Sequence, residues 1–224
     1  MSQIFRVLWD AIRAFWEELL FLALMNLVTV LLMLPVVTFP PALAALCCVA
    51  NLVAREKAIH WSDYFDGFRR YFLKSWALAL LNILVLVIMA TNIWFYTPDV
   101  APFKLSPQAS LALDALFATL GLLWILMQLY AFPLVLEQTD ERLRTALRNA
   151  LALIVINPGF SILLLIFLVL IAALSIAVPP LWVLLTFAFF AVVCNRAVIH
   201  LLQPFRDKMA AGQTGESASE RVSE

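Results

Sequence analysis

The sequence predicts an all-α, polytopic membrane helical bundle with six spans, organised as three parallel helix-hairpin repeats that each follow an amphipathic interfacial helix. Two observations support this fold class. First, 64% of the 224 residues are hydrophobic and only 13% are charged, whereas soluble domains are about half apolar and a quarter charged. Second, one pattern of acidic, basic and apolar residues occurs three times along the chain. The lipid bilayer is therefore the first partner that the sequence predicts.

In the repeated pattern the second residue is acidic, an arginine stands three positions after it, and an asparagine follows an apolar run. It reads WDAIRAFWEELLFLALMN from residue 9, FDGFRRYFLKSWALALLN from residue 65 and DERLRTALRNALALIVIN from residue 140. The acid–arginine pairs are Asp10 and Arg13, Asp66 and Arg69, and Glu141 and Arg144, and the asparagines are Asn26, Asn82 and Asn157. The pattern predicts a single membrane domain over residues 1–203, with repeats of about 1–59, 60–137 and 138–203.

The first repeat begins with residues 3–16, whose polar and apolar side chains separate at helical spacing, as in a helix that lies in the membrane interface. Residues 19–39 are largely apolar and long enough to cross the bilayer. The next apolar stretch, 42–54, covers only about 20 Å at 1.5 Å per residue. It either crosses as a short second span or forms a re-entrant segment, and the charge distribution favours a crossing.

The second repeat begins with the aromatic-rich amphipathic residues 61–72, and a span over 76–96 follows. Three prolines between residues 97 and 110 predict a loop, because proline interrupts a continuous helix. Residues 111–136 form a span long enough to tilt.

The third repeat begins with a charged stretch at 137–149, which precedes apolar stretches at 151–178 and 181–202. Two adjacent prolines separate these stretches and predict a tip between two spans. The residues from 204 to 224 are small, polar and charged, and this composition predicts a disordered cytoplasmic tail.

Basic residues are distributed as a six-span topology with both termini in the cytoplasm requires. Lys104 is the only lysine or arginine in the three predicted outer tips, and cytoplasmic segments of membrane proteins carry the excess of Lys and Arg. If residues 42–54 were re-entrant, the first interfacial helix and the segment 55–74 would lie on opposite sides of the membrane. The basic residues of one of them would then be outside. We therefore predict a multi-pass protein of the cytoplasmic membrane.

Several functional classes find no support in the sequence. The formal charge is zero, which does not suggest a nucleic-acid partner. The chain has two histidines, and its three cysteines lie in apolar segments without metal-ligand spacing. It also lacks a phosphate-binding glycine loop and a nucleophile motif. We expect no catalytic residue, no cofactor and no metal, and hence a protein that is not an enzyme.

Two sets of residues are candidates for function. The acid–arginine pairs either support the helix surface at the headgroup level or form a docking collar for a cytoplasmic partner. The three asparagines lie within predicted spans, where an amide should face protein or water. They either make interhelical hydrogen bonds or converge on a polar solute site. Neither oligomeric state nor ligand follows from these patterns.

One stretch carries a family resemblance. Residues 35–72 contain Pro41-Ala42-Leu43-Ala44-Ala45, then Arg55-Glu56 after a short helix, and then Asp63-Tyr64-Phe65-Asp66-Gly67-Phe68-Arg69-Arg70. These motifs, with the length and span layout, resemble the YesL-like family of bacterial integral membrane proteins over about residues 4–205. The resemblance implies a bacterial inner membrane and an association with carbohydrate uptake, and it implies no established activity and no catalytic residues.

The function predicted is a non-enzymatic membrane accessory or regulatory protein, associated with a carbohydrate transporter complex. The alternative is a small-solute transporter or substrate-binding membrane subunit with a polar site at the three asparagines near the repeat axis.

Overall fold

The computed structural model describes residues 2–95 and 106–222, and the regular structure in these residues is entirely helical. In chain order the elements are α1 (Ser2–Glu17), α2 (Leu19–Met33), the 3-10 turn η1 (Val36–Thr38), α3 (Phe39–Ala54), α4 (Trp61–Arg70), α5 (Phe72–Phe95), α6 (Pro107–Glu137), α7 (Leu143–Ile156), α8 (Pro158–Ala177), α9 (Pro179–Leu181), the π-helical turn η2 (Trp182–Thr186) and α10 (Phe187–Val222). Most of the predicted loop at 97–110 falls outside the described residues.

The helices confirm an all-α protein with several candidate membrane spans. Five segments are long and apolar enough to cross a membrane, and a sixth results if α1 and α2, which meet at a bend of 87°, count as one span. The five are 36–54, 72–95, 108–137, 158–177 and 179–208. The described residues thus form a candidate multi-pass membrane protein, and its orientation across the bilayer stays a prediction.

The predicted boundary between the first two spans is wrong. The sequence placed it between residues 39 and 42, where Pro40-Pro41 separates the two apolar stretches, but α2 ends at Met33 and α3 begins at Phe39. Both prolines lie in the first turn of α3, where the missing N–H group would have had no intrahelical acceptor. The second span therefore gains its missing length at its N-terminal side, and the first shortens to a helix of 15 residues.

The succession of a short helix, an outgoing helix and a returning helix occurs three times, but the three copies break at different places. The first break is at Glu18, the second at Tyr71 and the third at Asn157. These residues occupy different positions in the repeated sequence pattern. The third break follows from Pro158, which begins a new helix because it cannot continue α7.

Helix α3 lies at the centre of the packed body, where α10, α4, α2, α5 and α6 contact it. Many of its buried side chains are small, among them Ala42, Ala44, Ala45, Val49 and Ala50. Small residues let helix backbones approach closely, which is how membrane helices gain packing contacts.

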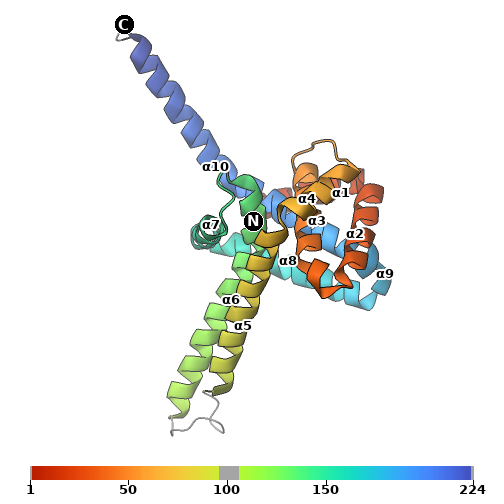
Figure 1. Cartoon of the computed structure of the whole chain (residues 1–224). Helices are drawn as coiled ribbons and strands as arrows, with labels where there is room; N and C mark the ends of the chain where they lie inside the picture. Colours follow the sequence, from red (N-terminus) through yellow and green to blue (C-terminus); the bar gives the residue numbers. More distant parts are fainter. Residues whose placement is uncertain (1, 96–105, 223–224) are drawn as a thin grey trace.

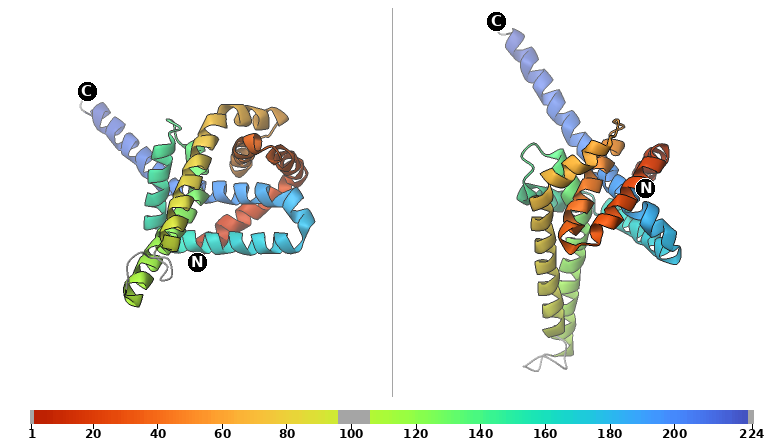
Figure 2. Two further views of the ribbon diagram at one scale, coloured as in Figure 1. Left: turned by 60° about the horizontal axis from the view of Figure 1, so that its bottom comes forward. Right: turned by 45° about the vertical axis from the view of Figure 1, so that its right-hand side comes forward.

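The α5–α6 hairpin projects away from this body as two long adjacent helices (Figure 1). The pair formed by α8 and the first part of α10 runs in a different direction (Figures 1 and 2). The structure therefore does not show a threefold arrangement of equivalent hairpins.

The residues from 204 onward, which were expected to form a disordered tail, belong to α10 in the structure. The helix continues through Pro204 to Val222, and this part extends beyond the body (Figure 1). The stretch contains helix-forming residues such as alanine and glutamate, although helices without tertiary packing are marginal in water. Disorder of the free tail in solution stays a prediction.

Candidate functional site

Glu137, the last residue of α6, is the centre of a buried ion cluster. Its side chain is 1% exposed, and Arg55 Nη2 lies 2.6 Å from its Oε2. Asn51 Nδ2 donates to Oε1 at 2.9 Å, and Arg206 donates to Oε2. This Glu137 cluster joins α3, α6 and α10. Removing one member of such a cluster leaves an uncompensated buried charge, so the three helices depend on it for their mutual position.

An amide network extends the Glu137 cluster into the body. Asn51 Nδ2 also lies 3.0 Å from Asn195 Oδ1, and both residues are buried. Asn195 Nδ2 donates to the carbonyl oxygens of Ala191 at 2.8 Å and Cys47 at 3.3 Å. The polar residues Asn51 and Arg55 are four positions apart on α3 and therefore share a face. Each of these buried amides thus has hydrogen-bond partners, as stable burial requires.

Glu141 is the centre of a second cluster, at the base of the α5–α6 hairpin. Lys74 Nζ lies 2.5 Å from its Oε2, Tyr71 Oη donates to Oε1 at 2.8 Å, and Arg70 donates to the same oxygen. Burial raises the pKa of Glu141, but the hydrogen bonds and charges of these partners outweigh it, so the net pKa is lowered. The Glu141 cluster therefore holds an ionised carboxylate between α4, α5 and the α6–α7 connection.

Backbone geometry supports the placement of Glu141. Its φ of 45° lies in the left-handed region, as does the φ of 56° at Glu56. A non-glycine residue in this region carries strain on the order of 1 kcal/mol. At both residues the strained turn brings a carboxylate to basic side chains of another segment.

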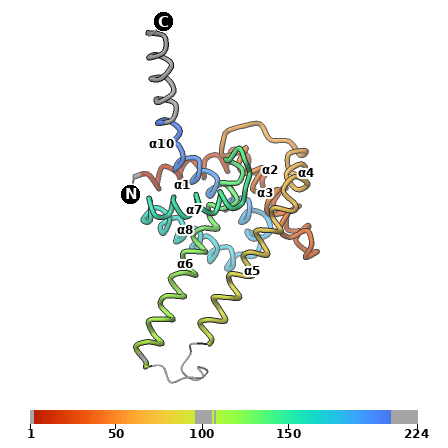
Figure 3. Tube along the Cα trace, turned by 60° about the vertical axis from the view of Figure 1, so that its left-hand side comes forward, coloured from red at the N-terminus to blue at the C-terminus, as the bar shows by residue number. Residues whose placement is uncertain are grey.

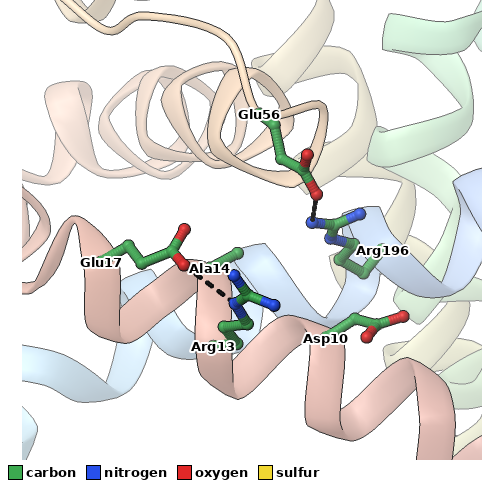
Figure 4. Close-up of a pocket in the computed structure, with 6 residues that line it drawn as sticks. All are labelled: Asp10, Arg13, Ala14, Glu17, Glu56 and Arg196. Atoms are coloured by element: carbon green, nitrogen blue, oxygen red, sulfur yellow. Dashed lines mark hydrogen bonds and ion pairs between the residues drawn. The ribbon is translucent and has the colours of Figure 1, made fainter.

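Glu56 takes part in a mixed-charge cavity beside α1 (Figure 4). Arg196 Nη2 lies 2.8 Å from its Oε1, and this hydrogen bond and charge lower the pKa of Glu56. On the facing helix, Arg13 Nε lies 2.9 Å from Glu17 Oε1. The resulting α1 cavity has a volume of about 240 Å³ and is lined by Asp10, Arg13, Ala14, Glu17, Glu56 and Arg196.

The predicted collar residues do not form the expected pairs. Arg13 pairs with Glu17 instead of Asp10, and Glu141 pairs with Arg70 and Lys74 instead of Arg144. Asp66, Arg69 and Arg144 are exposed. Among the described residues, no ion pair links the acid and the arginine three positions apart in any of the three copies.

The three predicted asparagines lie in separate surroundings. Asn26 is fully buried, donates to the carbonyl oxygen of Val183 at 2.7 Å and accepts from the Ala188 N–H at 2.8 Å. Asn82 accepts from Trp124 Nε1 at 3.0 Å, which links α5 to α6. Asn157 lies at the break between α7 and α8. The structure does not bring the three amides into one site.

Sequence reasoning missed the residues that the structure actually brings together. Glu137, Asn51 and Asn195 received no role as a group, although each is a polar residue at the end of, or within, an apolar stretch. The four-residue spacing of Asn51 and Arg55 was a usable signal, because it places two polar side chains on one face of an otherwise apolar helix. Which distant carboxylate they meet depends on helix packing.

The described residues contain no group of three or more His, Cys, Asp or Glu side chains placed to hold a metal ion. The arrangement is instead one of paired charges and satisfied amides, which position helices. That no cofactor takes part stays a prediction.

Part of the chain is similar to a known protein family, whereas no curated protein and no solved structure matches it. The matched segment runs from the start of α2 almost to the end of α5. It includes five residues of the charged clusters, which are Asn51, Arg55, Glu56, Arg70 and Lys74. The YesL-like name itself stays a resemblance. Over residues 19–93, the chain is similar to the family described as "Protein of unknown function, DUF624".

Proposed function

We propose that this multi-span membrane protein is a non-enzymatic accessory or regulatory protein that docks a membrane transporter complex through exposed arginines of α4 and α7. The observation that carries the proposal is the contrast between neighbouring basic residues. Arg70 is engaged by Glu141. Arg69 and Arg144 are exposed, and no ion pair of theirs occurs in the part of the chain that the structure describes.

The Glu141 cluster makes these two arginines suitable for docking. Arg69 precedes Arg70, and Arg144 follows Glu141 by three residues, so the cluster fixes the backbone next to both arginines. A guanidinium presents a rigid set of donors that binds carboxylates in two-point geometry. Basic side chains on a fixed surface steer and orient a partner with an acidic patch.

The exposed α5–α6 hairpin supports a partner within the bilayer as well. Ser75 is the one residue of α5 that is buried, so much of the helix surface is open to lipid or to another membrane protein. Asn82, Thr119 and Asn92 add polar groups to this otherwise apolar hairpin. Polar side chains and close packing are what associate membrane helices with one another.

The carbohydrate class of the transporter rests on the YesL-like resemblance alone. The solute-transporter alternative needs the three asparagines to face one cavity, and their separate partners lend it no support. The accessory role is therefore the stronger proposal.

The proposal is tested by affinity purification of the tagged, full-length protein from its native membrane after mild solubilisation. We expect a transporter subunit to copurify with the natural sequence and to be lost, at least tenfold, from the double variant Arg69→Ala, Arg144→Ala. The matched control is the double variant Arg6→Ala, Lys208→Ala, which also removes two exposed basic side chains but leaves α4 and α7 unchanged. Retention of the complex by the variant Arg69→Ala, Arg144→Ala overturns the proposed docking surface.

A further inference from the structure

Helix α1 has three distinct faces that set its depth in a membrane. One face is buried against the body and consists of Ile4, Val7, Ala11, Ala14 and Phe15. A second face is apolar yet exposed, and consists of Phe5, Trp9, Ile12 and Trp16. The third face is polar and consists of Gln3, Arg6, Asp10, Arg13 and Glu17.

The exposed apolar face points to the bilayer interface. Trp9 and Trp16 are 70% and 71% exposed, and tryptophan is enriched where the apolar core meets the headgroups. A helix with such a face beside a charged face lies in the interface plane. In Figure 3, α1 runs across the direction of the α5–α6 hairpin, as an interfacial helix does relative to a span. The α1 cavity, which the polar face borders, is thereby placed at headgroup depth.

The lining of the α1 cavity has hydrogen-bond donors and a carboxylate that are available to a charged ligand. Each arginine uses one nitrogen to bind its carboxylate. Arg13 Nε binds Glu17, and Arg196 Nη2 binds Glu56. Arg196 Nε is buried and has no hydrogen-bond partner among the described residues. Asp10 borders the same cavity, and no ion pair to it occurs in the described chain. Figure 4 shows these charged side chains, which come from α1, α10 and the segment after α3, lining the same cavity.

Three carboxylates face two guanidiniums in this lining, which disfavours an anion that carries no positive group. A ligand with a phosphate and an ammonium matches both kinds of site, because charge-assisted hydrogen bonds form to each end. We propose that the α1 cavity binds the headgroup of a phospholipid that carries a primary ammonium beside its phosphate. The phosphate lies on Arg13 and Arg196, and the ammonium lies on Asp10.

Native mass spectrometry of the full chain in a mild detergent tests this binding. The protein is given equal amounts of phosphatidylethanolamine and phosphatidylglycerol with identical acyl chains, and the ratio of bound lipids is measured. We expect about a tenfold preference for the ethanolamine lipid, the discrimination that one charge-assisted contact of about 1.4 kcal/mol provides. Asp10→Asn should reduce this preference to near unity, whereas Arg13→Gln should weaken binding of both lipids.

The matched control is Arg6→Gln, which lies on the same polar face outside the cavity lining and should leave the preference unchanged. Because Asp10 and Arg13 are exposed, these variants keep the packed face of α1, and an unchanged size-exclusion profile verifies this. Equal binding of the two lipids by the natural sequence overturns the proposal, as does an unchanged preference in Asp10→Asn. A third arm adds glycerophosphoethanolamine, which lacks acyl chains. Displacement of lipid at equal concentration would assign the cavity to a soluble ester and overturn the lipid source.

Discussion

The body around α3 and the α5–α6 hairpin have nearly the same apolar composition and very different surroundings. In the most apolar window of the α3 span 61% of residues are buried, whereas none is buried in the corresponding window of α5. Helix α6 belongs to both regions. Its inner part, including Leu126, Tyr130 and Leu134, is buried in the body, while Leu111, Leu116 and Leu122 are exposed on the hairpin.

The difference shows that apolarity alone does not decide which membrane helices pack together. Lipid tails are as apolar as leucine, so association depends on close packing and interhelical polar contacts. Helix α3 offers small side chains and the amide of Asn51, which reaches both Glu137 and Asn195. Beyond its base, where Lys74 and Trp76 bond to Glu141 and Val37, helix α5 offers bulky aliphatic residues and the hydrogen bond between Asn82 and Trp124. The body is thus joined by polar clusters, and the hairpin is free along most of its length.

The largest expected effect comes from removing the central carboxylate of the body. Glu137→Ala leaves Arg55 and Arg206 without their shared acceptor and Asn51 without one of its partners. We expect the free energy of unfolding to fall by about 3–5 kcal/mol, the usual consequence of breaking a buried ion pair. Titration with SDS in mixed micelles, followed by circular dichroism, measures it.

The control for this prediction is Glu17→Ala, which breaks an ion pair of similar length whose side chains are 74% and 56% exposed. Exposed pairs contribute little, so this variant should unfold like the natural sequence. Equal losses in the two variants would mean that the Glu137 cluster is no more important than a surface pair, and the contrast between body and surface would be lost.

Much of the fold follows from the sequence because composition and periodicity are local properties. The all-helical class, the charged stretches before the spans and the interfacial pattern of α1 could all be predicted from residues close together in the chain. The boundary at Pro40-Pro41 was predicted wrongly because a proline pair can end one helix or begin the next. Which of the two the proline pair does depends on how α3 packs in the body.

The candidate site was less predictable because its contacts join distant segments. Glu141 was identified as a collar residue, yet its partners lie about 70 positions away, at Arg70, Tyr71 and Lys74. Asn26, Asn82 and Asn157 occupy equivalent positions in the sequence pattern but not in the structure. One reason is that Pro158 ends the helix of the third copy at its asparagine. A local sequence pattern shows which side chains share a helix face, but it does not show which distant segment packs on that face.

A comparison of two glycines sharpens the contrast between the regions. A Cβ on Gly67 of α4 would lie 3.0 Å from Cys48 Cβ and 3.4 Å from Ala45 Cα of α3. Gly67→Leu must therefore separate α4 from α3, and we expect a loss of about 1–3 kcal/mol in the free energy of unfolding, as overpacking produces. The same SDS titration measures this loss.

Gly121→Leu is the matched variant on the hairpin. A Cβ there meets no atom within 4 Å, and leucine favours a helix over glycine by about 0.8 kcal/mol. This variant should be as stable as the natural sequence or slightly more stable. A loss as large as that of Gly67→Leu would show that this part of the hairpin is closely packed, and the contrast between body and hairpin would be lost.

The smallest effect concerns pH at the Glu141 cluster, where the hairpin joins the body. The pKa of Glu141 is lowered in the folded protein from the ordinary value of 4.5. Its contribution to stability is therefore complete above that value and is lost as the pH falls through the lowered pKa.

In Glu141→Gln the ion pairs with Lys74 and Arg70 are absent at every pH. The stability difference between the natural sequence and this variant should be constant from pH 7 down to about pH 5 and should shrink as the pH falls through the lowered pKa. Thermal unfolding midpoints of both proteins across this range measure the difference, and subtraction removes the titration of the other carboxylates. A difference that does not shrink on acidification would mean that Glu141 acts through packing, and that the base of the hairpin is held by shape instead of charge.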